Sequence, residues 1–138
     1  FGHGDSEKYL KDKCQKYKIS NQVFFEGSID NNKLLDTIKN YDAMLSASET
    51  ETFGLNIIEC LSRGVPVISY PAKTILEITL NNPIIFFYNN NNELISTLKH
   101  FTEKVNTEKR LLSQKIIREK FHINTMLKNY IKMYENLV

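Results

Sequence analysis

The sequence predicts an α/β protein in which a parallel sheet carries helices on both faces. Short apolar segments at residues 23–25, 43–45, 65–68 and 84–87 alternate with longer amphipathic segments of helical period. Strands that are buried on both faces are apolar along their whole length, and the connecting helices cover the sheet. A chain of 138 residues, 41% hydrophobic and 25% charged, is long enough for one domain with one core.

The helical segments follow from the spacing of their apolar residues. In the segment at 55–63, Ile57, Ile58 and Leu61 share one face, and Gly64 supplies a left-handed C-terminal stop. We expect further helices at 7–17, 31–39, 75–80, 93–101, 108–120 and 125–137. The run of four Asn residues at 89–92 is expected to form a solvated turn.

Charge and composition exclude several classes of protein. A net charge of +2 gives no reason to expect general nucleic-acid binding. The stretch 99–132 nevertheless holds nine Lys or Arg and three Glu, which is compatible either with a solvated helix face or with an anionic partner. No apolar run is long enough to span a membrane, and the three His and two Cys show no metal-ligand spacing. Two isolated cysteines, Cys14 and Cys60, fit a reducing compartment.

The residues suited to ligand binding gather between positions 48 and 69. Gly54 precedes a helix whose first N–H groups have no partners inside the helix, an arrangement that suits a phosphate. Leu55 and Glu59 are four apart and share a helix face, so Leu55 can pack on a flat ring beside hydroxyls held by Glu59. Glu51 precedes the helix and can hold a second set of hydroxyls. The alternatives are a Glu59–Arg63 ion pair and a dipole-complementing role for Glu51.

The spacing of these residues resembles a known motif. Glu51 and Glu59 have seven residues between them, with Phe53-Gly54-Leu55 inside the interval. This is similar to the Glu-seven-Glu motif of retaining, GT-B-fold glycosyltransferases of the group 1 type. The resemblance continues in chain order through Gly2-His3-Gly4, Val23-Phe24-Phe25-Glu26-Gly27, Tyr41-Asp42-Ala43, the Ser-containing stretch 46–48, Gly64-Val65-Pro66-Val67-Ile68, Glu77-Ile78 and a terminal helix at 130–137.

The resemblance implies a C-terminal, donor-binding, Rossmann-like domain over residues 1–138. The chain opens on Phe1-Gly2-His3-Gly4, which is typical of a strand end and its turn. We therefore expect a partial domain that lacks its first strand and helix, in a longer protein whose N-terminal acceptor domain is outside this chain.

The resemblance also implies a role for each matching residue. Glu51 would contact the transferred sugar and is the catalytic candidate. Backbone amides at Phe53, Gly54 and Leu55 would contact sugar and diphosphate, and Glu59 would bind the ribose. The base would lie near Gly27, Ser28 and Ile29, with Leu34 as a second candidate.

One departure from the family pattern falls at Lys73 and Thr74. The family usually has a Gly pair there, so Lys73 either places a positive charge on a phosphate or is a solvated loop residue. His3 has the same two interpretations, a phosphate contact or a solvated turn residue.

The implied function is transfer of a sugar, with retention, from a nucleoside-diphosphate sugar to a polysaccharide or lipid-linked acceptor. No metal, no other cofactor and no nucleic acid would be needed. The protein would be bacterial and cytoplasmic, and the basic stretch allows peripheral contact with the inner face of the membrane. Two rivals remain open: a GT-B-type nucleotide-sugar epimerase, and a degenerate GT-B-like domain that binds a partner without catalysis.

Overall fold

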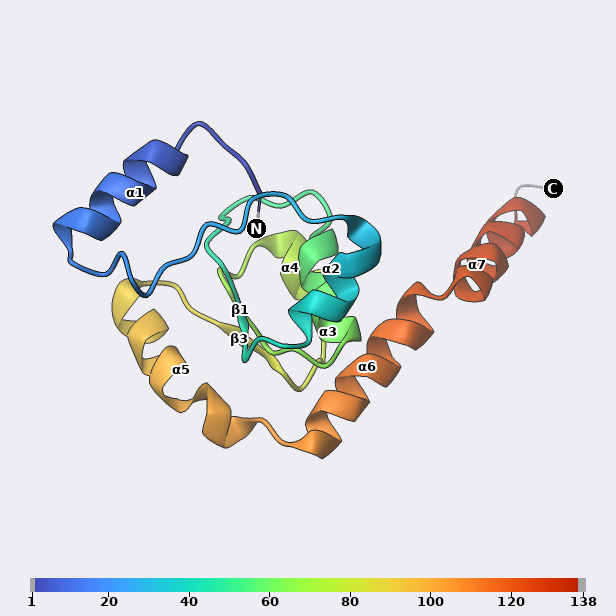
Figure 1. Ribbon diagram of the computed structural model, residues 1–138. Helices are drawn as coiled ribbons and strands as arrows, with labels where there is room; N and C mark the ends of the chain where they lie inside the picture. The colour runs from blue at the N-terminus through green and yellow to red at the C-terminus, as the bar shows by residue number, and fades with distance from the viewer. Residues whose placement is uncertain (1, 137–138) are drawn as a thin grey trace. The chain divides into compact units, whose positions relative to one another are not determined.

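The computed structural model describes residues 2–136, without the side chains of residues 31 and 32. Phe1 and Leu137, assigned above to the opening turn and the last helix, lie outside the described residues. The chain forms two compact units, Phe1–Asp36 and Thr37–Val138, and each is described by itself. The elements in chain order (Figure 1) are α1 (Glu7–Lys16), α2 (Asn31–Ile38), β1 (Met44–Ser46), α3 (Leu55–Ser62), β2 (Val67–Ser69), α4 (Lys73–Ile78), β3 (Ile85–Phe87), α5 (Asn91–Lys104), α6 (Thr107–Phe121) and α7 (Ile123–Glu135).

The second unit is built on a parallel sheet. Its described part has three strands in the order β1-β2-β3, with Leu45 opposite Ile68 and Ile68 opposite Phe86. All three strands were predicted from their apolar runs, and their ends differ from the prediction by at most two residues. The parallel sheet is therefore confirmed, because β1 pairs with β2 and β2 with β3 in parallel, with α3 and α4 as the crossover helices between them.

Helices cover both faces of the central strand. Ile68 packs in a buried cluster with Tyr88 and with Phe101 of α5. Val67 and Ser69 point to the opposite face, where α3 contacts β2, and both are fully buried. The prediction of a sheet with helices on both faces is thus confirmed, and the N-terminal end of α3 lies beyond the carboxyl end of β1.

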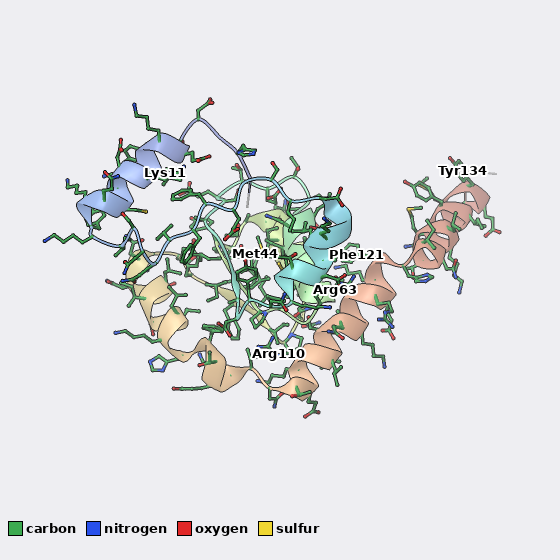
Figure 2. All side chains as sticks on the ribbon, viewed as in Figure 1. Lys11, Met44, Arg63, Arg110, Phe121 and Tyr134 are labelled. Atoms are coloured by element: carbon green, nitrogen blue, oxygen red, sulfur yellow. The ribbon has the colours of Figure 1, made fainter. Side chains whose placement is uncertain are left out.

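A long helix, α6, packs along α3 (Figure 1). Ser113 Oγ donates to the carbonyl of Leu61 at 3.1 Å, and Arg110 Nη1, from the residue labelled in Figure 2, donates to the carbonyl of Gly64 at 2.7 Å. Gly64 has φ +72°, as expected for the stop signal of α3. Arg110 is therefore not part of a purely solvated basic face, because it caps the end of a neighbouring helix.

Four helices begin earlier than predicted. α4 starts at Lys73 rather than at residue 75, and α5 at Asn91 rather than at residue 93. α6 starts at Thr107 rather than at residue 108, and α7 at Ile123 rather than at residue 125. The Asn run is therefore not a simple turn. Asn90 is the N-cap, its side chain accepts from the Glu93 N–H, and Glu93 accepts in return from Asn89 and Asn90. These reciprocal bonds satisfy free backbone donors at the helix start.

The first unit contains α1 and an extended segment, and it differs from prediction at residues 23–25. This segment was predicted to be a strand, but it forms none among the described residues. Residues 23–26 make no backbone hydrogen bond in that part of the chain, and Phe24 is 74% exposed. Apolar content favours a strand, but only ladder hydrogen bonds to a neighbour define one.

Candidate functional site

The centre of the candidate site is the start of α3. Gly54 is the N-cap, and its carbonyl accepts from the N–H groups of Ile57 and Ile58 at 3.1 Å each. The N–H groups of Leu55 and Asn56 have no hydrogen-bond partner among residues 2–136. Two free donors and the positive end of the helix dipole therefore face the same point, which suits an anion.

Gly54 is required by the local backbone. It has φ +79° and ψ +45°, a left-handed backbone conformation that is energetically unfavourable for residues other than glycine. A β-carbon at this position would lie 2.6 Å from Ile75 Cδ1 and 3.3 Å from Ile78 Cδ1. Two apolar side chains of α4 therefore pack directly against the start of α3, and sequence reasoning did not assign either of them to the site.

The first candidate acid, Glu51, lies beside Gly54. Its Cγ would be 3.5 Å from a β-carbon on Gly54, and its Oε1 accepts from the Thr52 N–H at 3.0 Å. This single bond uses one of the acceptor positions of the carboxylate, and the others remain open to a ligand. The structure thus places the Glu51 side chain next to Gly54.

The second candidate acid, Glu59, lies one turn along α3 from Leu55. Leu55 is 64% exposed, although leucine side chains are usually buried. The Glu59 carboxylate is half-buried and forms no hydrogen bond or ion pair with the residues that the structure describes, so the alternative pairing with Arg63 is not formed. An exposed apolar side chain and an unpaired acid therefore share one helix face.

Phe53 contributes more than its backbone. Its N–H has no partner within the described chain, in keeping with the role assigned to its amide. Its ring, 44% exposed, meets the ring of Phe121 edge to face, with centroids 5.9 Å apart and planes at 82°. Phe121 was not among the predicted site residues, since no local spacing connects the end of α6 to this loop.

Lys73 and Thr74 occupy the first turn of α4. They were expected in a loop, and the structure instead places both inside a helix whose N-cap is Ala72. Lys73 is exposed and forms no ion pair with any described residue, while Thr74 is half-buried. Both interpretations of Lys73, a phosphate contact or a solvated side chain, remain compatible with this position.

The residues predicted to bind a base belong to the first unit. Gly27 has φ +64°, and its carbonyl accepts from the Gly2 N–H at 2.6 Å. His3 lies beside it, since a β-carbon on Gly27 would be 3.2 Å from His3 Cε1. The two glycine-containing segments of the motif set therefore meet in space. Ser28 is exposed and Ile29 is half-buried.

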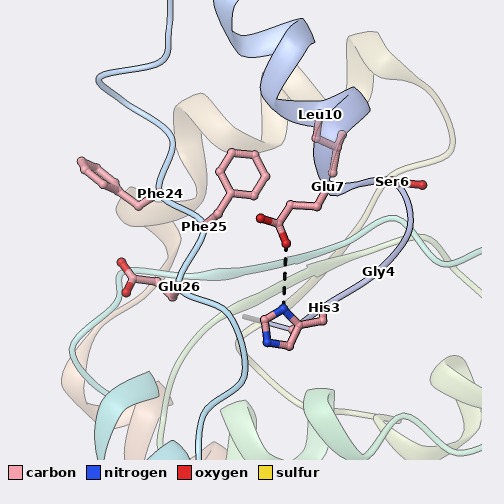
Figure 3. Close-up of a pocket in the computed structure, with 9 residues that line it drawn as sticks. His3, Gly4, Ser6, Glu7, Leu10, Phe24, Phe25 and Glu26 are labelled. Atoms are coloured by element: carbon pink, nitrogen blue, oxygen red, sulfur yellow. Dashed lines mark ion pairs between the residues drawn. The ribbon is translucent and has the colours of Figure 1, made fainter.

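A pocket of about 270 Å³ opens next to this contact (Figure 3). It is lined by Gly2, His3, Gly4, Ser6, Glu7, Leu10, Phe24, Phe25 and Glu26. His3 Nδ1 lies 3.9 Å from Glu7 Oε2, and Glu7 also accepts from Lys11 at 2.6 Å. The hydrogen bond and the charge of Lys11 lower the pKa of Glu7. Of the side chains that line this pocket, only His3 was considered a possible ligand contact in the sequence analysis.

Other chemistry is limited in the described part of the chain. No group of three or more His, Cys, Asp or Glu side chains is arranged there to hold a metal ion. Burial, together with the neighbouring Glu59 carboxylate, raises the pKa of the Cys60 thiol to about 11. Such a thiol stays protonated at neutral pH and is a poor nucleophile. Within residues 2–136, no helix combines the length and the apolar character that a membrane crossing requires.

A parallel α/β sheet with free helix amides and acids beyond its strand ends is the arrangement in which many α/β proteins bind phosphate-containing ligands. The family model described as Glycosyl transferases group 1 matches residues 1–119, and the chain belongs to that family. The fold is also that of a chain in the crystal structure of a GtfA/B complex, with a TM-score of 0.72 over 96% of this chain and 28% of the other, at 16% identity.

Curated relatives are longer proteins. An uncharacterized 41.2 kDa protein in the cps region of Klebsiella pneumoniae is 25% identical over 135 residues, covering 96% of this chain and 37% of that protein. The UDP-N-acetylglucosamine–peptide N-acetylglucosaminyltransferase GtfA subunit of Streptococcus agalactiae is 30% identical over 89 residues, covering 62% of this chain and 17% of that protein. This chain therefore spans 37% or less of the length of either relative.

Proposed function

We propose that this chain is the donor-binding part of a glycosyltransferase that takes a sugar from a nucleoside-diphosphate sugar. The observation that carries the proposal is the pair of free N–H groups at Leu55 and Asn56, with the unpaired Glu59 one turn away and Glu51 beside Gly54. Membership of the group 1 family supports it. The rest of the protein, with the acceptor-binding domain, would lie outside residues 1–138.

Each part of the donor matches one part of this arrangement. The diphosphate would accept hydrogen bonds from the amides around Gly54, where the helix dipole favours negative charge. Leu55 would pack on a flat ring, and Glu59 would accept hydrogen bonds from the ribose diol. Glu51 would hold the hydroxyls of the transferred sugar. Lys73 and Thr74 would add to the phosphate contacts.

The base would lie in the first unit, near Gly27, Ser28 and Ile29. Gly27 allows a close approach because its left-handed backbone carries no side chain. This assignment rests on the family motif, with Leu34 as a second candidate.

The chemical step would consist of departure of the nucleoside diphosphate and attack by an acceptor hydroxyl on the same face of the sugar. Negative charge grows on the bridging phosphate oxygen as the bond to the anomeric carbon breaks. Fixed N–H donors at the start of α3 would stabilise that charge without rearranging, which is the main way in which oriented dipoles accelerate such a step. The proton of the acceptor hydroxyl would pass to the departing phosphate oxygen, and the nucleoside diphosphate would then leave as the second product.

The test is a titration of the full-length protein with UDP and GDP. The UDP sugar in the name of the Streptococcus agalactiae relative supports UDP as the first probe. Glu59→Ala should raise the Kd about ten- to hundredfold, because hydrogen bonds to a charged group contribute roughly 1.5–3 kcal/mol. Glu103→Ala, at an exposed position of α5, is the matched control and should bind as the wild type does. If no nucleoside diphosphate binds at millimolar concentration, the proposal fails.

Glu51 offers a second, independent test. Because its proposed contact is the sugar, Glu51→Ala should lower turnover much more than it lowers affinity for UDP or GDP. Equal losses of turnover and of nucleotide affinity would contradict that role. Products decide between the rivals: a transferred sugar supports the transferase, an epimerised donor supports an epimerase, and neither activity nor nucleotide binding supports a partner-binding domain.

The acceptor is proposed to be a polysaccharide or a lipid-linked glycan at the inner face of a bacterial membrane. A stripe of apolar side chains on α7, each 45–63% exposed, supports peripheral contact with anionic lipid. The α7 stripe consists of Ile123, Met126, Leu127, Tyr130, Ile131, Met133 and Tyr134. Lys128 and Lys132 lie on the opposite side of the helix. An amphipathic helix of this kind binds the boundary between headgroups and acyl chains.

Vesicle sedimentation tests this contact with the full-length protein. Anionic vesicles should retain the protein at low salt and release part of it at moderate salt. The variant Leu127→Ser with Ile131→Ser should lose binding, whereas Asn129→Ser on the polar side should not. Retention that is indifferent to lipid charge and to these substitutions would remove the membrane from the proposal and leave the nucleotide site untouched.

A further inference from the structure

We propose that the last turn of α6, Lys120 and Phe121, positions the start of α3 for the donor phosphates. The proposal rests on the function proposed above, since it assigns two positioning residues to that same site. Neither residue would touch the donor. Both act through other groups, namely the loop that carries Phe53 and the short helix α4 that packs against Gly54.

Lys120 fixes the end of α4. Its Nζ donates to the carbonyls of Glu77 at 2.8 Å and Ile78 at 3.1 Å, which are the last carbonyls of that helix. A positive charge on these otherwise free acceptors also complements the negative end of the helix dipole. The side chains of Ile75 and Ile78 from this helix are those that meet Gly54. Lys120 therefore holds the surface on which the start of α3 rests.

Phe121 fixes the loop on the other side of Gly54. Its ring packs edge to face against Phe53, the residue directly before Gly54. Lys120 Nζ lies 5.7 Å from the centre of the Phe121 ring, so the two contacts belong to one local arrangement. A single turn of α6 thereby restrains both sides of the free amides at Leu55 and Asn56 (the α6 end is labelled at Phe121 in Figure 2).

The docking of α6 does not depend on these two residues. Ser113 donates to the carbonyl of Leu61 in α3, and Arg110 donates to the carbonyl of Gly64 just after that helix. Ile117 of α6 is buried, with 2% exposure. Phe53, by contrast, is 44% exposed. Loss of the Phe121 ring should therefore loosen the loop at the site while the helix stays in place, which separates positioning from general stability.

The experiment compares two aromatic residues of different burial in the full-length protein. Phe121→Ala should raise the Kd for UDP or GDP about three- to tenfold, the range expected for one lost aromatic pair, with little change in Tm. Phe121→Tyr should restore affinity because it keeps the ring. Phe101→Ala, in the buried cluster under α5, should lower Tm and leave the Kd of the folded protein unchanged.

A second readout needs no ligand. Amide hydrogen exchange at Ile57 and Ile58, whose N–H groups bond to the Gly54 carbonyl, should be faster in Phe121→Ala than in the wild type, while exchange in β2 should be unchanged. Lys120→Met should give the same pattern, and Lys120→Arg, which still donates to the α4 carbonyls, should not. If Phe121→Ala fails to fold, the comparison of Lys120→Met with Lys120→Arg still tests the proposal.

The outcomes separate this inference from the proposed function. If the wild type binds neither UDP nor GDP but the variants still show the exchange pattern, the proposed function fails and the restraint of the loop by α6 is supported. A wild type that binds, with unchanged affinity and exchange in both alanine and methionine variants, would overturn the inference alone. Equal loss of affinity in Phe101→Ala would also overturn it, because the effect would then be general destabilisation.

Discussion

Gly54 packs so closely against Ile75 that a single added methyl group would come within 2.6 Å of Cδ1 of that side chain. Gly54→Ala must also hold an L side chain at φ +79°. We expect a loss of about 1–2 kcal/mol in the free energy of unfolding from the backbone conformation, and weaker nucleotide binding because the amides shift. Denaturant unfolding and a UDP titration measure the two effects.

The matched control for that change is Gly4→Ala. Gly4 does not adopt the left-handed conformation, and a β-carbon there would meet nothing within 4 Å. Its free energy of unfolding should stay within about 0.5 kcal/mol of the wild type. Equal effects of the two substitutions would show that the left-handed backbone at Gly54 is not what limits the site.

The buried hydrogen bond of Ser113 in the α3–α6 interface should contribute to stability. This side chain is fully buried and donates to the carbonyl of Leu61. Ser113→Ala should lower the free energy of unfolding by about 1 kcal/mol, the usual net value of such a bond. Ser96→Ala, on the exposed side of α5, should be neutral or slightly stabilising because alanine favours helices. A neutral Ser113→Ala would mean that the bond is not formed in solution.

The Glu93 carboxylate at the start of α5 should make stability depend on pH. Hydrogen bonds from the backbone and side chain of Asn89, and from the Asn90 side chain, lower the pKa of Glu93 from its ordinary 4.5. Since the folded-state pKa is the lower one, this stabilisation is present above pH 4.5 and is lost as the pH falls through the folded value. The difference in unfolding free energy between wild type and Glu93→Gln should therefore shrink on acidification. A constant difference would contradict this.

We expect the Cys60 thiol to react with alkylating reagents only when the protein is unfolded. Its pKa, raised to about 11 by burial and by Glu59, leaves almost no thiolate at neutral pH. Iodoacetamide should therefore leave Cys60 unmodified in the native protein and label it in denaturant, as peptide mass spectrometry would show. Rapid labelling of the native protein at neutral pH would mean that α3 opens far more often than its buried contacts suggest.

The sequence was most informative where local chemistry decides the structure. The three strands were predictable because fully buried parallel strands are apolar throughout, and the end of α3 because Gly64 is the residue that tolerates φ +72°. The closeness of Glu51 and Gly54 was implied by motif spacing, since only two residues lie between them in the chain.

The rest depended on contacts between distant residues. Nothing near Phe53 in the sequence indicates that Phe121 will pack against it, and Lys120 looks like any other lysine of a basic helix. The start of α5 was different, because the signal was present: Asn90 followed three residues later by Glu93 is a capping pattern. The expectation that residues 89–92 form a solvated turn overlooked this pattern.

The dependence of α3 on α6 also sets an order of events during synthesis. Every residue of α3 leaves the ribosome before Thr107, where its partner helix begins. Until then the carbonyls of Leu61 and Gly64 lack the side chains that bind them, and the side of α3 that faces α6 is uncovered. A nascent chain paused at that stage would expose apolar surface of the kind that chaperones bind.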